Sequence, residues 1–222
     1  MSRPPRPTYR VGMTAITAPR TLSFSRVAGG LVIVAAATGI AGAIALLVVP
    51  PAVPPDIFSY PLEGSAYAVV QASFFVNHVL LGLGLVALLM LPVSRARPGH
   101  AGLWIALVGM AVLAVCELWA IGVADAAYPS PETAPLDIGY GVSSIALGVG
   151  LVLAGIGVAR SREWSGWRRW IVLVAGVMLF VVVLPGLLAG FVGGRIGLAL
   201  WMVAWGLIGV ALVTERPPGR PA

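Results

Sequence analysis

The chain contains no lysine and a single cysteine, Cys116. All 14 of its basic residues are therefore arginine. One cysteine cannot form an intrachain disulfide, and no C-x-x-C metal or redox motif is present. We expect Cys116 to pack as a small apolar side chain. The absence of lysine, with abundant alanine, glycine, valine and proline, is typical of a GC-rich bacterial genome.

Charge of either sign is scarce. Only 10% of the residues are charged, against about a quarter in soluble proteins. Hydrophobic residues make up 59% of the chain, and its mean hydropathy is +0.98. A soluble fold cannot bury this much apolar surface, so the lipid bilayer is the predicted partner. The net charge of +6 lies in short arginine loops that suit anionic headgroups, which excludes nucleic acid as a partner.

Long apolar runs are the dominant feature of the chain. Hydrocarbon about 30 Å thick requires about 20 helical residues to cross it, and six runs reach roughly this length. The predicted spans are 27–49, 67–92, 101–124, 138–160, 170–189 and 193–214. The predicted fold class is an all-α integral membrane protein, a bundle of six transmembrane helices.

The arginines are distributed asymmetrically across these crossings. Numbering the loops in turn places 13 of the 14 arginines on one side, and only Arg195 on the other. Five acidic residues lie on the side of Arg195: Asp56, Glu63, Asp125, Glu132 and Asp137. Because basic loops remain in the cytoplasm, both termini are predicted to be cytoplasmic, in a bacterial plasma membrane.

Three segments make up the predicted domain organisation. Residues 1–26 are rich in proline and arginine and predict a disordered cytoplasmic tail, in which Met13 is an alternative start. Residues 27–214 form the transmembrane domain, and 215–222 a short cytoplasmic tail. The first apolar run is too long for a signal peptide and lacks a small-residue cleavage site, so we expect a retained helix.

Two loops on the acidic side are rich in proline, at about 50–66 and 125–137. Proline ends helices and favours extended backbone, and tyrosine is common at membrane interfaces. These tendencies account for both loops structurally. The alternative is that the loops form a lid over a cavity or a surface for a partner.

The chain also matches itself at a shift of 66 positions. Trp104 and Ile105, for example, fall on Trp170 and Ile171. Spans two and three would then be a hairpin repeated in parallel as spans four and five, as in some transporters. Low-complexity apolar sequence also matches itself by chance, so both explanations stay open.

Small residues lie in stripes along the spans, as on span three at Gly102, Ala106 and Gly109. Helices in lipid associate through close packing over such residues. Pro185 is expected to weaken the end of span five, because it has no amide to donate.

A few polar residues lie within the spans and form the candidate site. Glu117 is the most informative, because a carboxylate within a span costs at least about 2.5 kcal/mol and therefore requires a partner or water. The complete candidate cluster is Glu117, His78, Asn77, Ser73, Tyr140, Ser143, Ser144 and Arg195.

Depth along the helices suggests partners for Glu117. At 1.5 Å per residue, Glu117 lies about 10 Å and His78 about 18 Å from the outer helix ends. This offset disfavours direct contact between them. Four residues match Glu117 in depth: Ser73, Tyr140, Ser143 and Ser144. Arg195 is a candidate ion-pair partner.

The sequence does not decide whether the protein is an enzyme, and it favours a non-catalytic function. No H-E-x-x-H, P-loop or Rossmann glycine pattern is present, and only one histidine lies within a span. No catalytic, cofactor-binding or metal-binding residue is therefore assigned. A dyad of His78 with Ser143 or Ser144 lacks the glycine context of a nucleophile.

Three functions remain in order of preference. The first is a non-catalytic carrier or accessory protein with an extracytoplasmic site around Glu117. The second is an assembly partner of other membrane proteins, or a homo-oligomer, held by glycine-rich faces. The third is an intramembrane enzyme that acts on a lipid-soluble substrate.

Overall fold

The computed structural model describes residues 18–94 and 97–215. Within these residues the fold is helical, with no strand and one isolated β-bridge between Ile57 and Ala127. The helices are α1 (Ala18–Val48), α2 (Gly64–Met90), the 3-10 helix η1 (Pro92–Ser94), α3 (Arg97–Gly122), α4 (Ala134–Ser161), α5 (Arg168–Met178), the π-helix η2 (Leu179–Val183), α6 (Leu184–Leu188) and α7 (Phe191–Val213).

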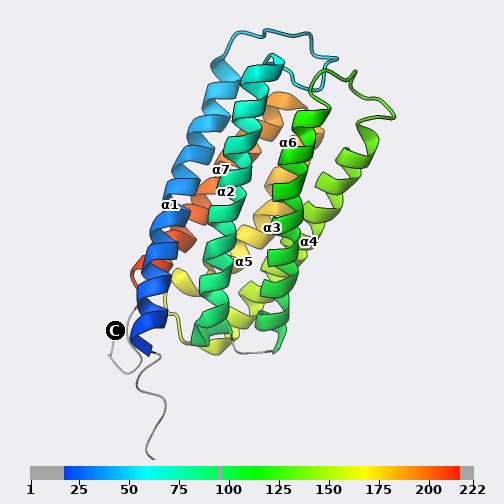
Figure 1. The fold of residues 1–222 in the computed structure, drawn as a ribbon. Coiled ribbons are helices and arrows are strands. Elements are labelled where there is room, and N and C mark those ends of the chain that lie inside the picture. The colour runs from blue at the N-terminus through cyan, green and yellow to red at the C-terminus, as the bar shows by residue number, and fades with distance from the viewer. Residues whose placement is uncertain (1–17, 95–96, 216–222) are drawn as a thin grey trace, which may run out of the picture.

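The long helices form a closed ring (Figure 1). Each helix packs against the next in the chain, and α7 returns to pack along α1. Neighbouring spans run antiparallel, because each loop between two spans turns the chain back at one end of the bundle. Helix α2 also contacts α7 across the ring, so side chains fill the centre of the bundle.

The prediction of six helices long and apolar enough to cross a membrane is confirmed. Most boundaries lie within a few residues of those expected. The largest difference is α1, which begins at Ala18 instead of residue 27 and so takes in the end of the predicted tail. Residues 1–17 and 216–222, which carry the rest of the tail predictions, lie outside the described residues.

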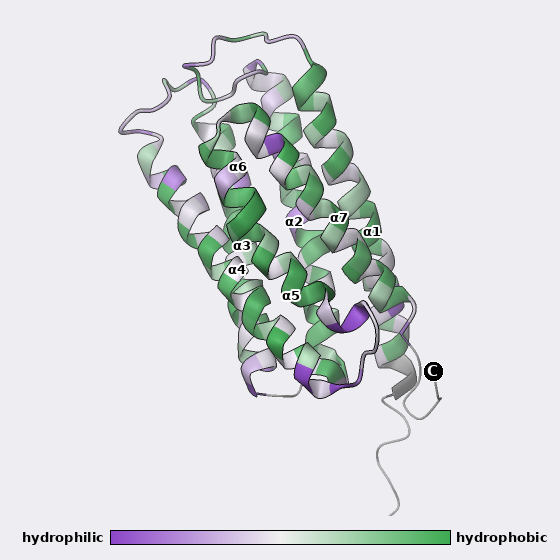
Figure 2. Ribbon diagram, turned by 180° about the vertical axis from the view of Figure 1, so that it is seen from behind, coloured by the Kyte–Doolittle hydropathy of each residue, from purple (hydrophilic) through white to green (hydrophobic). Residues whose placement is uncertain are grey.

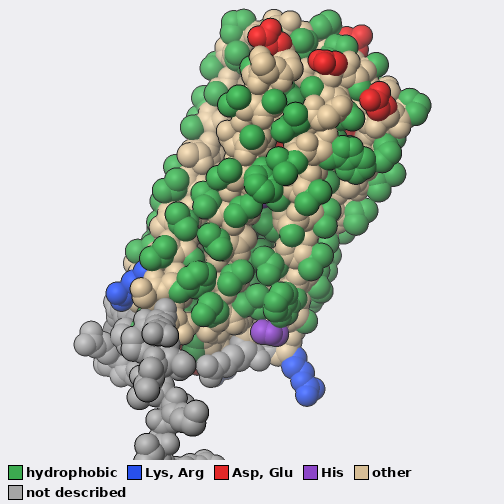
Figure 3. Space-filling model, viewed as in Figure 1, with side chains coloured by type: hydrophobic (Ala, Val, Ile, Leu, Met, Phe, Trp, Pro, Cys, Tyr) green, Lys and Arg blue, Asp and Glu red, His purple; other side chains and the backbone are tan. Residues whose placement is uncertain are grey.

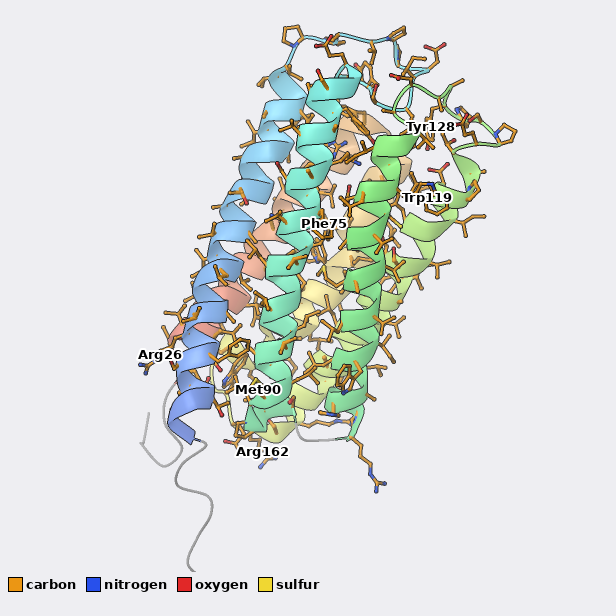
Figure 4. All side chains as sticks on the ribbon, viewed as in Figure 1. Arg26, Phe75, Met90, Trp119, Tyr128 and Arg162 are labelled. Carbon is orange, nitrogen blue, oxygen red and sulfur yellow. The ribbon has the colours of Figure 1, made fainter. Side chains whose placement is uncertain are left out.

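Charged side chains lie at the two ends of the bundle, and apolar side chains form a belt between them (Figures 2 and 3). We call one end the acidic end, since its loops 49–63 and 123–133 carry Asp56, Glu63, Asp125 and Glu132. The other is the arginine end, with Arg160 in the last turn of α4 and Arg162 directly after that helix. Figure 4 shows Tyr128 at the acidic end, and Arg26 and Arg162 at the opposite one.

The apolar belt consists of large exposed side chains that no other part of the described chain covers. Val115 on α3 is 61% exposed, and Val142 on α4 is 63% exposed. A soluble protein does not display a belt of this kind on all sides, whereas lipid tails solvate it. The exposed surface therefore suggests a multi-pass membrane protein.

Helices α3 and α4 pack closely against each other, and glycines from both sides permit it. A Cβ on Gly102 would lie 2.5 Å from the backbone nitrogen of Ala154, and one on Gly150 would lie 2.4 Å from that of Ala106. Gly109 faces Leu147 in the same way. The small-residue stripe of span three is therefore buried against α4 within one chain.

The fifth span is not a continuous α-helix. It passes from α5 through the π-helix η2 into α6, where Pro185 occupies the first turn. Proline has no amide to donate, so it interrupts the hydrogen bonding of the helix that continues from η2. The sequence correctly indicated an irregularity near Pro185, and the structure places it upstream, in η2.

Candidate functional site

Glu117 lies on the inner face of α3, one turn from its end at the acidic end of the bundle. Its side chain is buried, and the residue is 7% exposed. The phenol of Tyr140 on α4 donates a hydrogen bond of 3.0 Å to Glu117 Oε2. Close packing of α3 against α4 over glycine brings the two residues together.

Gln71 connects this pair to α2. Its amide nitrogen donates to the phenol oxygens of Tyr67, at 3.1 Å, and Tyr140, at 3.4 Å. A polar line therefore runs from Tyr67, near the acidic end, to Glu117 inside the bundle.

His78 extends the line further from the acidic end. Its Nδ1 lies 3.8 Å from Glu117 Oε1 and 2.7 Å from the carbonyl oxygen of Phe74. A carbonyl only accepts hydrogen bonds, so Nδ1 must carry a proton, and in the neutral ring Nε2 is the acceptor. The Nδ1 proton is thus hydrogen-bonded to the Phe74 carbonyl oxygen, and Nδ1 lies close to the Glu117 carboxylate.

Arg195 on α7 interacts with Glu117, Tyr67 and Tyr140 through its charge. Its guanidinium carbon lies 4.9 Å from the centre of the Phe191 ring. No nitrogen of Arg195 comes within 4 Å of a carboxylate oxygen in residues 18–94 and 97–215, so the expected ion pair with Glu117 is not formed. Glu117 is compensated mainly by uncharged donors.

The expectation that His78 and Glu117 lie too far apart for contact was wrong. Helix α2 begins beyond the end of α3 at the acidic end, so depths counted from the two ends are not comparable (Figure 1). Side chains also lean toward the N-terminus of their helix. On antiparallel α2 and α3, His78 and Glu117 therefore lean toward one another.

Four other candidate residues do not join this cluster. Asn77 donates to the carbonyl oxygen of Ala35 at 2.6 Å and so ties α2 to α1. Ser73 is exposed and bonds within its own helix. Ser143 donates to the carbonyl of Gly139, and Ser144 makes no side-chain hydrogen bond within the described chain. Neither serine bonds to His78, so the dyad is not assembled.

Tyr67 and Gln71 belong to the site. The sequence shows Gln71 as a polar residue within a span, but neither residue was placed in the candidate cluster. The signal for them was their spacing with His78, since positions 67, 71, 74 and 78 follow one stripe of a helix. Ser73 and Asn77 lie on a different stripe of the same helix. Helical periodicity therefore separates the polar residues of α2 correctly, whereas depth alone mixes them.

The two proline-rich loops pair with each other over this end of the bundle. Phe58 donates its amide to Ala126 at 2.9 Å, and Tyr128 donates its amide to Asp56 at 2.7 Å. The Phe58 ring contacts Tyr67 at 6.2 Å between ring centres and packs over the α3–α4 contact. The site is therefore covered by what we call the lid, residues 50–63 and 123–133.

Tyr128 fastens the lid to α4. Its phenol interacts electrostatically with Asp137 at the start of α4, and its ring lies 5.4 Å from that of Phe58. Burial, and then the charge of Asp137, raise the pKa of the Tyr128 phenol. The phenol therefore remains protonated beside the carboxylate.

The arginine end is closed by a second polar cluster. Glu215 Oε2 accepts from Arg168 and from the indole of Trp164, both at 2.6 Å. Arg168 also donates to the carbonyl of Ala211 and lies over the Trp164 ring. These contacts tie the start of α5 to the end of α7, so the line of polar residues does not continue through this end.

The site has the chemistry of proton or cation binding. One carboxylate, one imidazole and two phenols lie together, whereas no group of three histidine, cysteine or acidic residues suited to a metal occurs among the described residues. The fold and site together define a class, a helical bundle with a buried, lid-covered carboxylate. No protein-family model, curated protein or solved structure matches the chain.

Proposed function

We propose that the protein is a non-catalytic integral membrane protein of the bacterial plasma membrane. Six apolar helices and the exposed apolar belt support membrane insertion. The concentration of arginine at one end supports a cytoplasmic location for that end, and hence for both termini. The acidic end with its lid then faces the outside.

We infer that this protein is a small carrier or accessory protein that binds a proton or small cation at Glu117. The observation that carries the proposal is the environment of this carboxylate, which is buried and has no cation in direct contact. A buried acidic group without an ion-pair partner is a frequent sign of an ion or proton pathway in a membrane.

Each neighbouring residue has a definite role in this function. Tyr140 positions one carboxylate oxygen through its hydrogen bond. His78 lies beside the other oxygen, with Nδ1 at 3.8 Å from it and hydrogen-bonded to the Phe74 carbonyl. Tyr67 and Gln71 connect the carboxylate to the underside of the lid, so entry from the acidic end requires the lid to move.

The assembly function receives less support from the contacts. It relies on glycine-rich faces being free, but Gly102, Gly109 and Gly150 pack against the backbone of a neighbouring helix in the same chain. A second copy has no access to these faces. We therefore place the assembly function second.

Thiol accessibility tests the proposal. In a Cys116→Ala background, Glu117→Cys is expected to react with a membrane-impermeant thiosulfonate reagent added from the outside. Reaction should be slower than for Asp125→Cys in the lid, because the lid must first open. Reagent added to the medium of inside-out vesicles, whose exposed face is the cytoplasmic one, distinguishes a carrier, labelled from both sides, from a site open only to the outside.

Val115→Cys supplies the matched control, since it lies on the same helix but faces lipid and is 61% exposed. An impermeant reagent is not expected to reach it. If Glu117→Cys reacts no faster than Val115→Cys from either side, the carboxylate is closed to water and the proposal fails. Labelling of Asp125→Cys from the cytoplasmic side alone would show that the acidic end faces the cytoplasm, opposite to the proposed orientation.

A further inference from the structure

A groove between α4 and α5 opens to the outer surface near the arginine end. Its volume is about 160 Å³. The residues that line it are Ile156, Ala159, Arg160, Arg169, Trp170 and Leu173. Two arginines and a tryptophan thus gather on a surface whose other walls are apolar, far from the Glu117 site.

Arg169 is held in a fixed orientation. Its Nε donates to the carbonyl oxygen of Ala159 at 2.7 Å, and its guanidinium carbon lies 5.1 Å from the centre of the Trp170 ring. No acceptor in the described part of the chain takes its two terminal nitrogens. Both nitrogens are therefore available to an anion in the groove.

Arg160 adds a second uncompensated charge. It lies in the last turn of α4, is exposed, and forms no ion pair with any described carboxylate. The nearest acidic residues in the sequence do not line the groove, and Glu215 already binds Arg168. The groove therefore carries two positive charges without a counterion from the described residues.

We propose that this groove binds an anionic phospholipid. The phosphate lies between Arg160 and Arg169, whose guanidinium groups suit phosphate oxygens. One acyl chain follows Ile156 and Leu173 away from the arginine end. The proposal rests on the membrane placement given above, and it does not depend on any role of Glu117.

The shape of the surface favours a lipid over a free phosphate ion. Ile156, Ala159 and Leu173 give the groove apolar walls, and exposed Val174 and Val177 follow along α5. A free phosphate leaves this apolar surface unused, whereas an acyl chain covers it. Trp170 is 48% exposed at the same level, as is common for tryptophan beside lipid headgroups.

Native mass spectrometry of the full chain tests the proposal. The detergent-purified protein is titrated with phosphatidylglycerol and, separately, with phosphatidylcholine of the same acyl chains. The protein is expected to retain phosphatidylglycerol preferentially. Arg160→Gln removes an exposed side chain without disturbing a packed contact, and is expected to weaken phosphatidylglycerol binding about tenfold, as for loss of one charge-assisted hydrogen bond.

A charge-matched control separates this groove from general attraction to the arginine end. Arg97→Gln with Arg162→Gln removes two exposed arginines that do not line the groove. This pair is expected to keep the lipid preference, whereas Arg160→Gln with Arg169→Gln is expected to abolish it. Circular dichroism checks that each variant remains folded.

Three results would overturn the proposal: equal retention of both lipids, an equal loss in the control pair, or displacement of phosphatidylglycerol by inorganic phosphate at millimolar concentration. The last result would indicate a site for a free anion instead. None of these results affects the thiol accessibility of position 117, so this proposal and the proposed function fail independently.

Discussion

At the scale of single residues, Glu117 and Arg195 are the informative pair because they do not form a salt bridge. The carboxylate accepts from Tyr140 and approaches His78, while the arginine lies over Phe191. A close ion pair inside a membrane would hold both charges permanently. Uncharged donors hold the carboxylate more weakly, as the proposed exchange of a proton or cation requires.

Tyr140→Phe is expected to destabilise the protein. The change removes the donor to Glu117 and leaves a buried acceptor with fewer partners, which costs about 1–3 kcal/mol. Unfolding in detergent, followed by tryptophan fluorescence, measures the loss. Tyr60→Phe is the matched control, since the Tyr60 ring packs against Phe191 and its hydroxyl makes no hydrogen bond among the described residues.

A double-mutant cycle with Glu117→Gln assigns the effect of Tyr140→Phe to the contact itself. The two changes are expected to be non-additive, because Tyr140→Phe removes the donor and Glu117→Gln removes the negative charge that strengthens the same hydrogen bond. Strict additivity would contradict the role given to Tyr140, even if each single variant proved unstable.

At the scale of helices, small residues determine which surfaces meet. Gly99 faces Gly157, and Gly29 faces Gly209, so α3–α4 and α1–α7 approach closely along antiparallel stripes. The stripes were visible in the sequence as packing surfaces. The sequence did not show whether the stripes pack within one chain or between chains, because a stripe is equally suited to either partner.

Gly102→Ala and Gly150→Ala are each expected to destabilise the bundle by about 1–3 kcal/mol through overpacking. In both cases the added methyl group meets the backbone of the opposite helix at 2.4–2.5 Å, where no side chain can move aside. Gly141→Ala on α4 is the control, since nothing lies within 4 Å of the added atom. Thermal unfolding of the three variants in one detergent compares them, and equal stability of all three would contradict the packing.

At the scale of the whole molecule, the two ends of the bundle differ. At the arginine end, Glu215 joins α5 to α7 through Arg168 and Trp164. At the acidic end, two loops close over the site through a few backbone hydrogen bonds and the ring of Phe58. In the proposed function, the acidic end is the one that opens.

Locking the lid is expected to block access to the site. Ile57 and Ala127 face each other across the β-bridge, between the hydrogen bonds of their neighbours, where opposed side chains are closest. In a Cys116→Ala background, oxidation of Ile57→Cys with Ala127→Cys is therefore expected to form a disulfide. Added to Glu117→Cys, the disulfide should slow labelling of position 117, and a reductant should restore it.

The single change Ile57→Cys, treated with the same oxidant, controls for damage to the lid. If the disulfide forms and labelling of position 117 is unchanged, water reaches the site by another route. The lid would then be a structural cover only.

The amino-acid sequence by itself determined the six helices, because the length and apolarity of a run decide whether it suits the bilayer. It also separated the two ends by charge and identified Glu117 as the unusual residue. Tyr140 was correctly predicted near Glu117, since both lie close to the same end of antiparallel helices. These are properties of single helices and their ends.

Only the tertiary structure decided which polar residues meet. His78 contacts Glu117, although counting residues from the helix ends placed His78 too deep in the bundle for this contact. Asn77, its neighbour in the chain, faces α1 instead. Position along a helix can be read from sequence, but which face meets which neighbour depends on the packing of the whole ring. For the same reason Arg195 shares the depth of Glu117 and yet forms no ion pair with it, because α7 directs its guanidinium over Phe191.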